Sequence, residues 1–224
     1  MKLGILGTGN VGQTLGTRCV ELGHEVTLGS RTADNEAAVA WASDTGAHHG
    51  TFADAVASAE LVINATSGIA SLAALTSTGD GALDGKIILD VANALDFSKG
   101  FPPTLAICND DSLGEQIQRE YPAAHVVKSL NTVNCDVMVH PDRVSGVHSM
   151  FVAGNDEPAK AVVMSLLHGF GWQEDALIDL GDITAARAME MYLPLWLRLF
   201  GTIGDADFNI NVVSARRGTS STSR

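Results

Sequence analysis

Lys2-Leu-Gly-Ile-Leu-Gly-Thr-Gly-Asn-Val-Gly12 is the run of sequence that decides the fold. Its apolar first half is typical of a strand, and the strand leads into the pattern Gly7-x-Gly9-x-x-Gly12. This is the turn that joins strand to helix in dinucleotide-binding βαβ units. Gly7 allows the tight turn, Gly9 lets the backbone approach a pyrophosphate, and Gly12 lets the helix pack closely on the strand.

The residues after the glycines favour a ligand site over an empty glycine-rich turn, which is the alternative. Apolar residues recur there at helical spacing: Val11, Leu15, Cys19 and Leu22. Gly23 is well placed to end that helix. The main-chain amides of Asn10 and Val11 are then expected to face the phosphates at the positive end of the helix.

The second predicted strand ends in Val26-Thr-Leu-Gly-Ser-Arg31, and this ending predicts which dinucleotide binds. An NAD enzyme places an Asp or Glu on the ribose 2′-hydroxyl about 20 residues after the glycines. This chain has Ser30 and Arg31 there, a hydroxyl and a permanent cation that suit a 2′-phosphate. We therefore predict NADP as the cofactor, the alternative being an ordinary solvated turn.

Composition excludes several other classes of protein. The chain has 224 residues and a net charge of −12, which disfavours nucleic acid as a partner. No apolar run reaches the ~18 residues that span a membrane, and no metal-binding motif is present. The three cysteines, Cys19, Cys108 and Cys135, lack a CxxC spacing, which is typical of a reducing compartment. We expect a cytoplasmic protein with no membrane or metal site.

Strands alternate with helices along most of the chain, which predicts an α/β fold with a doubly wound parallel sheet of the Rossmann type. Strands are expected at 2–6, 24–29, 47–49, 61–65, 86–91, 125–130, 149–153 and 176–180. Helices are expected after the glycine turn and at 33–45, 51–58, 71–75, 111–120, 157–168 (ended by Gly169) and 182–200. The predicted domains are a dinucleotide-binding domain at 1–144 and a small C-terminal α/β segment at 145–213 that packs back on it. A disordered tail is expected at 214–224.

The predicted helix at 182–200 is apolar nearly all round in its second half, and Pro194 is expected to kink it. A helix of this kind most often fills a core. The alternatives are that it walls a ring-binding pocket or forms a dimer face.

Ligands of open α/β sheets lie beyond the carboxyl ends of the strands, where this chain places small polar residues. Thr66, Ser67 and Asn93 are therefore expected to join the glycine turn in binding the cofactor. Lys128 is the only charged candidate acid or base near the later strand ends, and we assign no catalytic residue. Hydride transfer between two rings needs mainly their placement and the exclusion of water.

The sequence resembles the NADPH-dependent reductases of the deazaflavin coenzyme F420 over most of residues 2–213. The resemblance rests on Gly7-Thr-Gly-Asn-Val-Gly12, Leu22-Gly-His-Glu-Val26 and Gly29-Ser-Arg31. It implies that Thr8, Ser30 and Arg31 hold the 2′-phosphate, and that Gly9, Asn10 and Val11 hold the pyrophosphate. It also implies a C-terminal part that forms the deazaflavin pocket, and a homodimer.

The chain departs from this family in one strand-end turn, where Asn131 stands in place of a His. The turn Lys128-Ser-Leu-Asn-Thr132 resembles that of the cytosolic domain of transmembrane ferric reductases, which pass hydride to a flavin. Asn131, Thr132 and Asn134 are the candidates for orienting the acceptor ring. F420 is the expected acceptor, with FAD or FMN as the alternative. A reductase of imines or carbonyls and a non-catalytic NADP-sensing protein also stay open.

Overall fold

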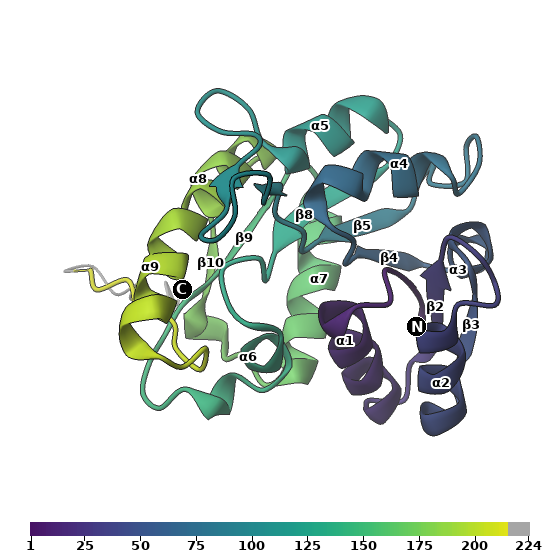
Figure 1. Cartoon of the computed structure of the whole chain (residues 1–224), viewed down its shortest axis with the longest axis horizontal. Coiled ribbons are helices and arrows are strands. Elements are labelled where there is room, and N and C mark those ends of the chain that lie inside the picture. The colour runs from purple at the N-terminus through teal and green to yellow at the C-terminus, as the bar shows by residue number, and fades with distance from the viewer. Residues whose placement is uncertain (215–224) are drawn as a thin grey trace, which may run out of the picture.

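A mixed eight-stranded sheet forms the centre of the computed structural model, which describes residues 1–214 (Figure 1). The strand order is β10-β9-β8-β5-β4-β1-β2-β3. The strands are β1 (Lys2–Leu6), β2 (Glu25–Ser30), β3 (His48–Thr51), β4 (Leu61–Asn64), β5 (Ile87–Asp90), β8 (His125–Ser129), β9 (Met150–Gly154) and β10 (Leu177–Asp179). The predicted Rossmann-type α/β fold is confirmed.

The register of the parallel strands brings the predicted site residues to one edge of the sheet. Leu6 pairs with Asn64, Asn64 with Asp90, and Asp90 with Lys128. These four residues are therefore level across β1, β4, β5 and β8. The turns that follow them lie side by side, as the carboxyl ends of parallel strands must.

The C-terminal segment continues this same sheet. Strand β9 pairs antiparallel with β8, and β10 pairs parallel with β9. The residues predicted as a separate small domain thus extend the sheet at its β8 edge. The β9 and β10 strands run opposite to the six parallel strands of the first half.

Helices cover both faces of the sheet. The longer ones are α1 (Asn10–Glu21), α2 (Glu36–Thr45), α5 (Leu113–Glu120), α7 (Glu157–Phe170) and α9 (Leu193–Ile203). The shorter ones are α3 (Phe52–Ala57), α4 (Ser71–Thr76), α6 (Cys135–Val139), α8 (Ala186–Met191) and the 3-10 turns η1 (Gly68–Ala70), η2 (Pro141–Arg143), η3 (Glu174–Ala176) and η4 (Ile183–Ala185). Helices α1, α2, α6 and α7 contribute to one apolar core, and α3, α4, α5 and α8 to the other.

Two helix predictions need correction. Helix α7 runs through Gly169 and ends at Gly171, whose φ of 112° gives the left-handed cap that stops a helix. The predicted helix at 182–200 is divided into η4, α8 and α9. The predicted effect of Pro194 is confirmed, because α9 restarts at Leu193 with this proline in its first turn.

The expectation that the apolar helix fills a core is wrong for α9. Only Leu193 of its residues is buried, while Leu195 and Ile203 are more than half exposed. Figure 1 shows α9 at the outer side of the fold, beyond β10. The buried part is α8, through Ala186, Met189 and Glu190.

Some elements were not predicted. Helix α6 and the hairpin of β6 (Leu95–Asp96) and β7 (Thr104–Leu105) lie in segments for which no helix or strand is predicted. Of the predicted tail, only Ser214 belongs to the described residues. No helix of residues 1–214 combines the length and apolar character needed to cross a membrane.

Candidate functional site

Two cavities lie along the carboxyl edge of the parallel strands and share one wall. The first, of about 540 Å³, is lined by Gly7, Thr8, Gly9, Arg31, Phe52, Ala65, Thr66, Ser67, Ala70, Ala73, Ala74 and Ser77. The second, of about 440 Å³, is lined by Asn10, Val11, Ala65, Thr66, Ser67, Gly68, Val91, Ala92, Asn93, Leu95, Phe97, Asn131, Val133, Asn134, Cys135, Met138, Leu193 and Trp196. The first is called the Arg31 cavity and the second the Asn131 cavity. The shared residues Ala65, Thr66 and Ser67 follow β4.

The three glycines of the first turn are required for different reasons. Gly7 has a φ of 118°, and a Cβ there would lie 2.5 Å from the carbonyl oxygen of Ala65. A Cβ on Gly12 would lie 2.0 Å from the carbonyl oxygen of Gly7. A Cβ on Gly9 would meet nothing within 4 Å. Packing therefore explains Gly7 and Gly12, whereas no packing contact among the described residues requires a glycine at Gly9.

Helix α1 begins at Asn10 without a side-chain cap. Its N-cap is Gly9, and the first amides of the helix lie where the two cavities meet. Uncapped amides at the positive end of a helix are a binding site for a pyrophosphate. The predicted contacts of Asn10 and Val11 fit this geometry.

The two residues at the end of β2 differ in accessibility. Arg31 is exposed, lines the Arg31 cavity with Thr8, and forms no ion pair within residues 1–214. Ser30 is buried, and its hydroxyl donates a hydrogen bond to the carbonyl oxygen of Thr32. Arg31 is thus free to bind a phosphate, while Ser30 holds the turn that presents it.

The wall between the cavities is fixed by a buried polar network. Asn64 donates hydrogen bonds from Nδ2 to Ser71 Oγ (3.0 Å) and to Asp90 Oδ1 (2.8 Å). Its Oδ1 accepts a hydrogen bond from Thr66 Oγ1 at 2.7 Å. The hydroxyl of Thr66 is therefore used in holding the β4 turn, a role that the sequence pattern did not reveal.

Asn93 and Asn131 form a pair in the wall of the Asn131 cavity. Asn93 Nδ2 donates to the main-chain oxygen of Asn131 (2.9 Å), and Asn131 Nδ2 donates to Asn93 Oδ1 (3.0 Å). Asn131 Oδ1 is buried with no partner in the described chain. Leu130, just before it, is fully buried with a φ of 63°, a conformation that costs a non-glycine residue about 1 kcal/mol or more.

Helix α9 contributes another part of the lining of the Asn131 cavity, through Leu193 and Trp196. Trp196 lines the cavity and stacks on Phe200 and on Phe208, with ring centroids 5.5 Å and 5.3 Å apart. Its indole Nε1 is buried without a partner among residues 1–214, as are Tyr192 Oη and Thr132 Oγ1. Buried polar atoms without partners point to an absent ligand or water.

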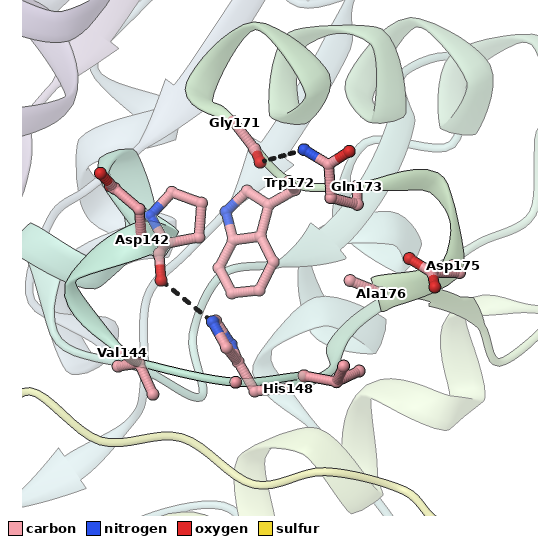
Figure 2. A pocket seen from close by; sticks show the side chains of 11 residues that line it. Asp142, Val144, His148, Gly171, Trp172, Gln173, Asp175 and Ala176 are labelled. Carbon is pink, nitrogen blue, oxygen red and sulfur yellow. Dashed lines mark hydrogen bonds between the residues drawn. The ribbon is translucent and has the colours of Figure 1, made fainter.

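A third cavity, of about 240 Å³, is lined by residues of η2, of the segment that leads to β9 and of the segment that follows α7 (Figure 2). Figure 2 shows the Trp172 ring facing it, with the His148 ring edge-on at 5.0 Å. The ring nitrogens are all paired: Trp172 donates to Met138, and His148 contacts Pro141 and Asn209. His148 and Ser149 hold the C-terminal segment through hydrogen bonds with Asn209 and Ile210, and Phe208 of that segment stacks on Trp196.

Comparisons with known proteins agree with this geometry. A structure from Arthrobacter sp. FB24, provisionally named an F420-dependent NADP-reductase, is 51% identical, with a TM-score of 0.91. The alignment covers 96% of this chain and 100% of that one. The sequence model of the family described as "NADP oxidoreductase coenzyme F420-dependent" matches residues 2–94. The chain belongs to this family.

More distant similarities are to a metalloreductase and to a solved structure of an imine reductase. Metalloreductase STEAP3 from Rattus norvegicus is 27% identical over 87% of this chain. The chain spans 38% of the length of that relative. An imine reductase from Aspergillus terreus, in complex with NADPH4, has a TM-score of 0.64 at 22% identity over 91% of this chain and 62% of that one. That likeness shows the fold alone. The family is one of NADP-dependent oxidoreductases.

In this family member, the candidate base Lys128 does not line either cavity. Its side chain is fully buried, with Nζ 2.8 Å from Asp90 Oδ2 and 2.9 Å from Glu190 Oε1. Burial lowers the pKa of Lys128, but the two carboxylates more than offset it, so the pKa is raised overall. Glu190 also accepts hydrogen bonds from the amides of Leu113 and Gly114. Lys128 is a permanent buried cation that joins β8, β5 and α8.

The structure brings most of the predicted site residues together. Those that line the two cavities are Gly7, Thr8, Gly9, Asn10, Val11, Arg31, Thr66, Ser67, Asn93, Asn131 and Asn134. Gly12, Ser30 and Thr132 lie behind the cavity walls. Asn134 Oδ1 accepts a hydrogen bond from the thiol of Cys135 at 3.3 Å. Trp196 and Leu193 were not singled out, although their helix was considered as a possible pocket wall. Within residues 1–214, no three metal-binding side chains gather.

Proposed function

We propose that this protein transfers a hydride between NADP(H) and the ring of coenzyme F420. The observation that carries the proposal is the pair of cavities that meet at Ala65, Thr66 and Ser67. One cavity offers an unpaired arginine and a glycine turn for the adenosine and pyrophosphate. The other offers buried polar atoms without partners and an indole for a second ring.

The residues present fit NADPH. Arg31 supplies a cation for the 2′-phosphate, the open space at Gly9 admits the pyrophosphate, and the uncapped amides of α1 face it. Bound NADPH supplies the hydride. The residues of the chain position that cofactor along the carboxyl ends of β1, β4 and β5.

The Asn131 cavity places and shields rings but contributes no charged acid or base. None of its lining residues is an Asp, Glu, Lys, Arg or His, and burial raises the pKa of the Cys135 thiol that it contains. Apolar side chains such as Val133, Met138 and Leu193 exclude water. Such a site suits transfer between stacked rings, in which the acceptor exchanges its proton with solvent.

The test mixes the protein with NADPH and oxidised F420 and follows the loss of deazaflavin absorbance. FMN, FAD and a cyclic imine replace F420 in parallel reactions. We expect turnover with F420. Turnover with a flavin or an imine but not with F420 would move the assignment to that acceptor. Tight NADPH binding without reduction of any acceptor would favour an NADP-sensing protein.

A flavin is the second candidate acceptor. The relationship to metalloreductase STEAP3, over 87% of this chain, favours it, and so does the uncharged Asn131 in the acceptor wall. Either ring would lie between the Asn93–Asn131 pair and Trp196. We propose that Asn131, Thr132 and Asn134 orient it.

We further propose a cytoplasmic homodimer. Helix α9 leaves Leu195 and Ile203 more than half exposed, and Val213 of the same C-terminal part is 83% exposed. Apolar surface of this kind is typical of an interface between protein chains. The free thiols of the described chain suit a reducing compartment.

A further inference from the structure

The hydrogen-bond pattern of the Asn93–Asn131 pair determines which atom of Asn131 is left for a ligand. A main-chain oxygen can only accept, so Asn93 must turn its Nδ2 toward the oxygen of Asn131. Asn93 Oδ1 then faces the other side chain and accepts from Asn131 Nδ2. Asn131 is therefore held with Oδ1 free.

The free oxygen needs a hydrogen-bond donor. Asn131 is 2% exposed and lines the Asn131 cavity, and Oδ1 has no partner in the described part of the chain. Trp196 also lines this cavity, and its indole N–H, which can only donate a hydrogen bond, is likewise buried without a partner in the described chain. A ligand that satisfies both atoms carries an N–H and a carbonyl oxygen.

We infer that Asn93 is a positioning residue and that Asn131 is a specificity-determining residue for the hydride acceptor. The pair selects a ring with an imide edge, the C(=O)–N–H group of a pyrimidinedione. Deazaflavins and flavins share this edge, whereas an imine substrate lacks it. The inference rests on the proposed function for the identity of the second ring.

The position of Asn131 favours the acceptor over the nicotinamide carboxamide, which also carries an N–H. Asn131 follows β8, which is separated from β1 by β4 and β5, and it shares its cavity with α6 and α9. The glycine turn follows β1 and the β4 turn follows β4, whereas Asn131 follows β8, which is two strands beyond β4. Asn131 is thus farther along the sheet than the expected path of the dinucleotide.

The experiment is a thermodynamic cycle that combines a substitution in the protein with a chemical change in the ligand. The measured quantity is the binding affinity. Riboflavin and N3-methylriboflavin are titrated into wild type and Asn131→Leu at saturating NADP⁺, with quenching of flavin fluorescence as the signal. The 5-deaza analogues of both ligands repeat the cycle and separate deazaflavin from flavin. Asn93→Leu tests the positioning role, and Asn155→Leu is the matched control because Asn155 lines neither cavity and its Oδ1 already accepts a hydrogen bond from the amide of Ile183.

We expect N3-methylation to weaken binding to wild type on the order of tenfold, the usual effect of one lost hydrogen bond to a buried group. Asn131→Leu should bind both ligands equally, Asn93→Leu should lose most of the discrimination, and Asn155→Leu should keep it. Equal effects of methylation in wild type and Asn131→Leu would overturn the inference.

A second arm compares NADP⁺ with its 3-acetylpyridine analogue, which lacks the amide N–H. If Asn131→Leu abolishes discrimination between these two, Asn131 serves the nicotinamide and the inference is wrong. Different results would refute the proposed function and the present inference. Loss of methyl discrimination in Asn131→Leu without F420 turnover would refute the function alone. F420 turnover without coupling would refute the inference alone.

Discussion

Replacing Arg31 by alanine tests the electrostatic origin of the preference for NADP. Arg31 lines the Arg31 cavity and has no ion-pair partner within residues 1–214, so its guanidinium is free to bind a phosphate. A hydrogen bond to a charged group contributes about 1.5–3 kcal/mol, and 1.4 kcal/mol is tenfold in affinity. We therefore expect Arg31→Ala to weaken NADPH binding by about 10- to 150-fold. Because NADH lacks the 2′-phosphate, its affinity should change by less than about twofold.

The measurement is calorimetric titration of NADPH and NADH at two salt concentrations. Arg31 is exposed, so the loss on mutation should be smaller at high ionic strength. Arg119→Ala is the matched control, because it removes the same charge from an exposed pair with Asp111 on α5, away from both cavities. It should leave both affinities unchanged. An equal loss of NADPH and NADH binding in Arg31→Ala would refute the reasoning, as would wild type that prefers NADH.

Four further predictions test the rest of the site. Gly9→Ala should keep the free energy of unfolding but lose NADPH binding, whereas Gly12→Ala, whose Cβ would lie 2.0 Å from a main-chain oxygen, should unfold at clearly lower urea concentration. Lys128→Met leaves two buried carboxylates unpaired and should cost about 3–5 kcal/mol in urea unfolding; an unchanged midpoint would contradict the assigned ion cluster. Asn131→His introduces a group with an ordinary pKa of about 6.5, so kcat/KM with the acceptor should fall below that pH as the imidazole loses its acceptor nitrogen, and a pH profile like that of wild type would count against contact with the ring. Leu195→Arg should convert a dimer to a monomer in light scattering, and a wild type that is monomeric would remove the proposed interface.

The cofactor half of the site could be predicted from the sequence because its determinants are local. The strand, the glycine turn, the helix and the second strand all lie within residues 2–31, and each has a recognisable periodicity or residue type. Gly171 in place of Gly169 as the end of α7 shows the limit of such patterns. Both glycines permit a helix end, and only the left-handed φ of Gly171 distinguishes them.

The acceptor half could not be predicted in the same way because its contacts join distant segments. Asn93 and Asn131 are 38 residues apart, and Lys128 meets a carboxylate on α8 that no local pattern connects to it. Helix α9 shows a second limit. Its apolar character predicts that it packs against something, but the residues of a helix do not say whether the partner is the core, a ligand or another chain.

If the proposed function holds, this division of the site separates the residues that bind the dinucleotide from those that contact the acceptor. The family match covers residues 2–94, which contain the glycine turn, Arg31 and the β4 turn, and ends just after Asn93. The far wall, from Asn131 to Trp196, lies outside that match. A change of a single side chain there, such as Asn131 in place of a titratable residue, alters the hydrogen bonds offered to the second ring without disturbing the dinucleotide. Acceptor specificity can therefore change while the cofactor site stays the same. We expect the Asn93–Asn131 pair to determine the acceptor specificity of this chain.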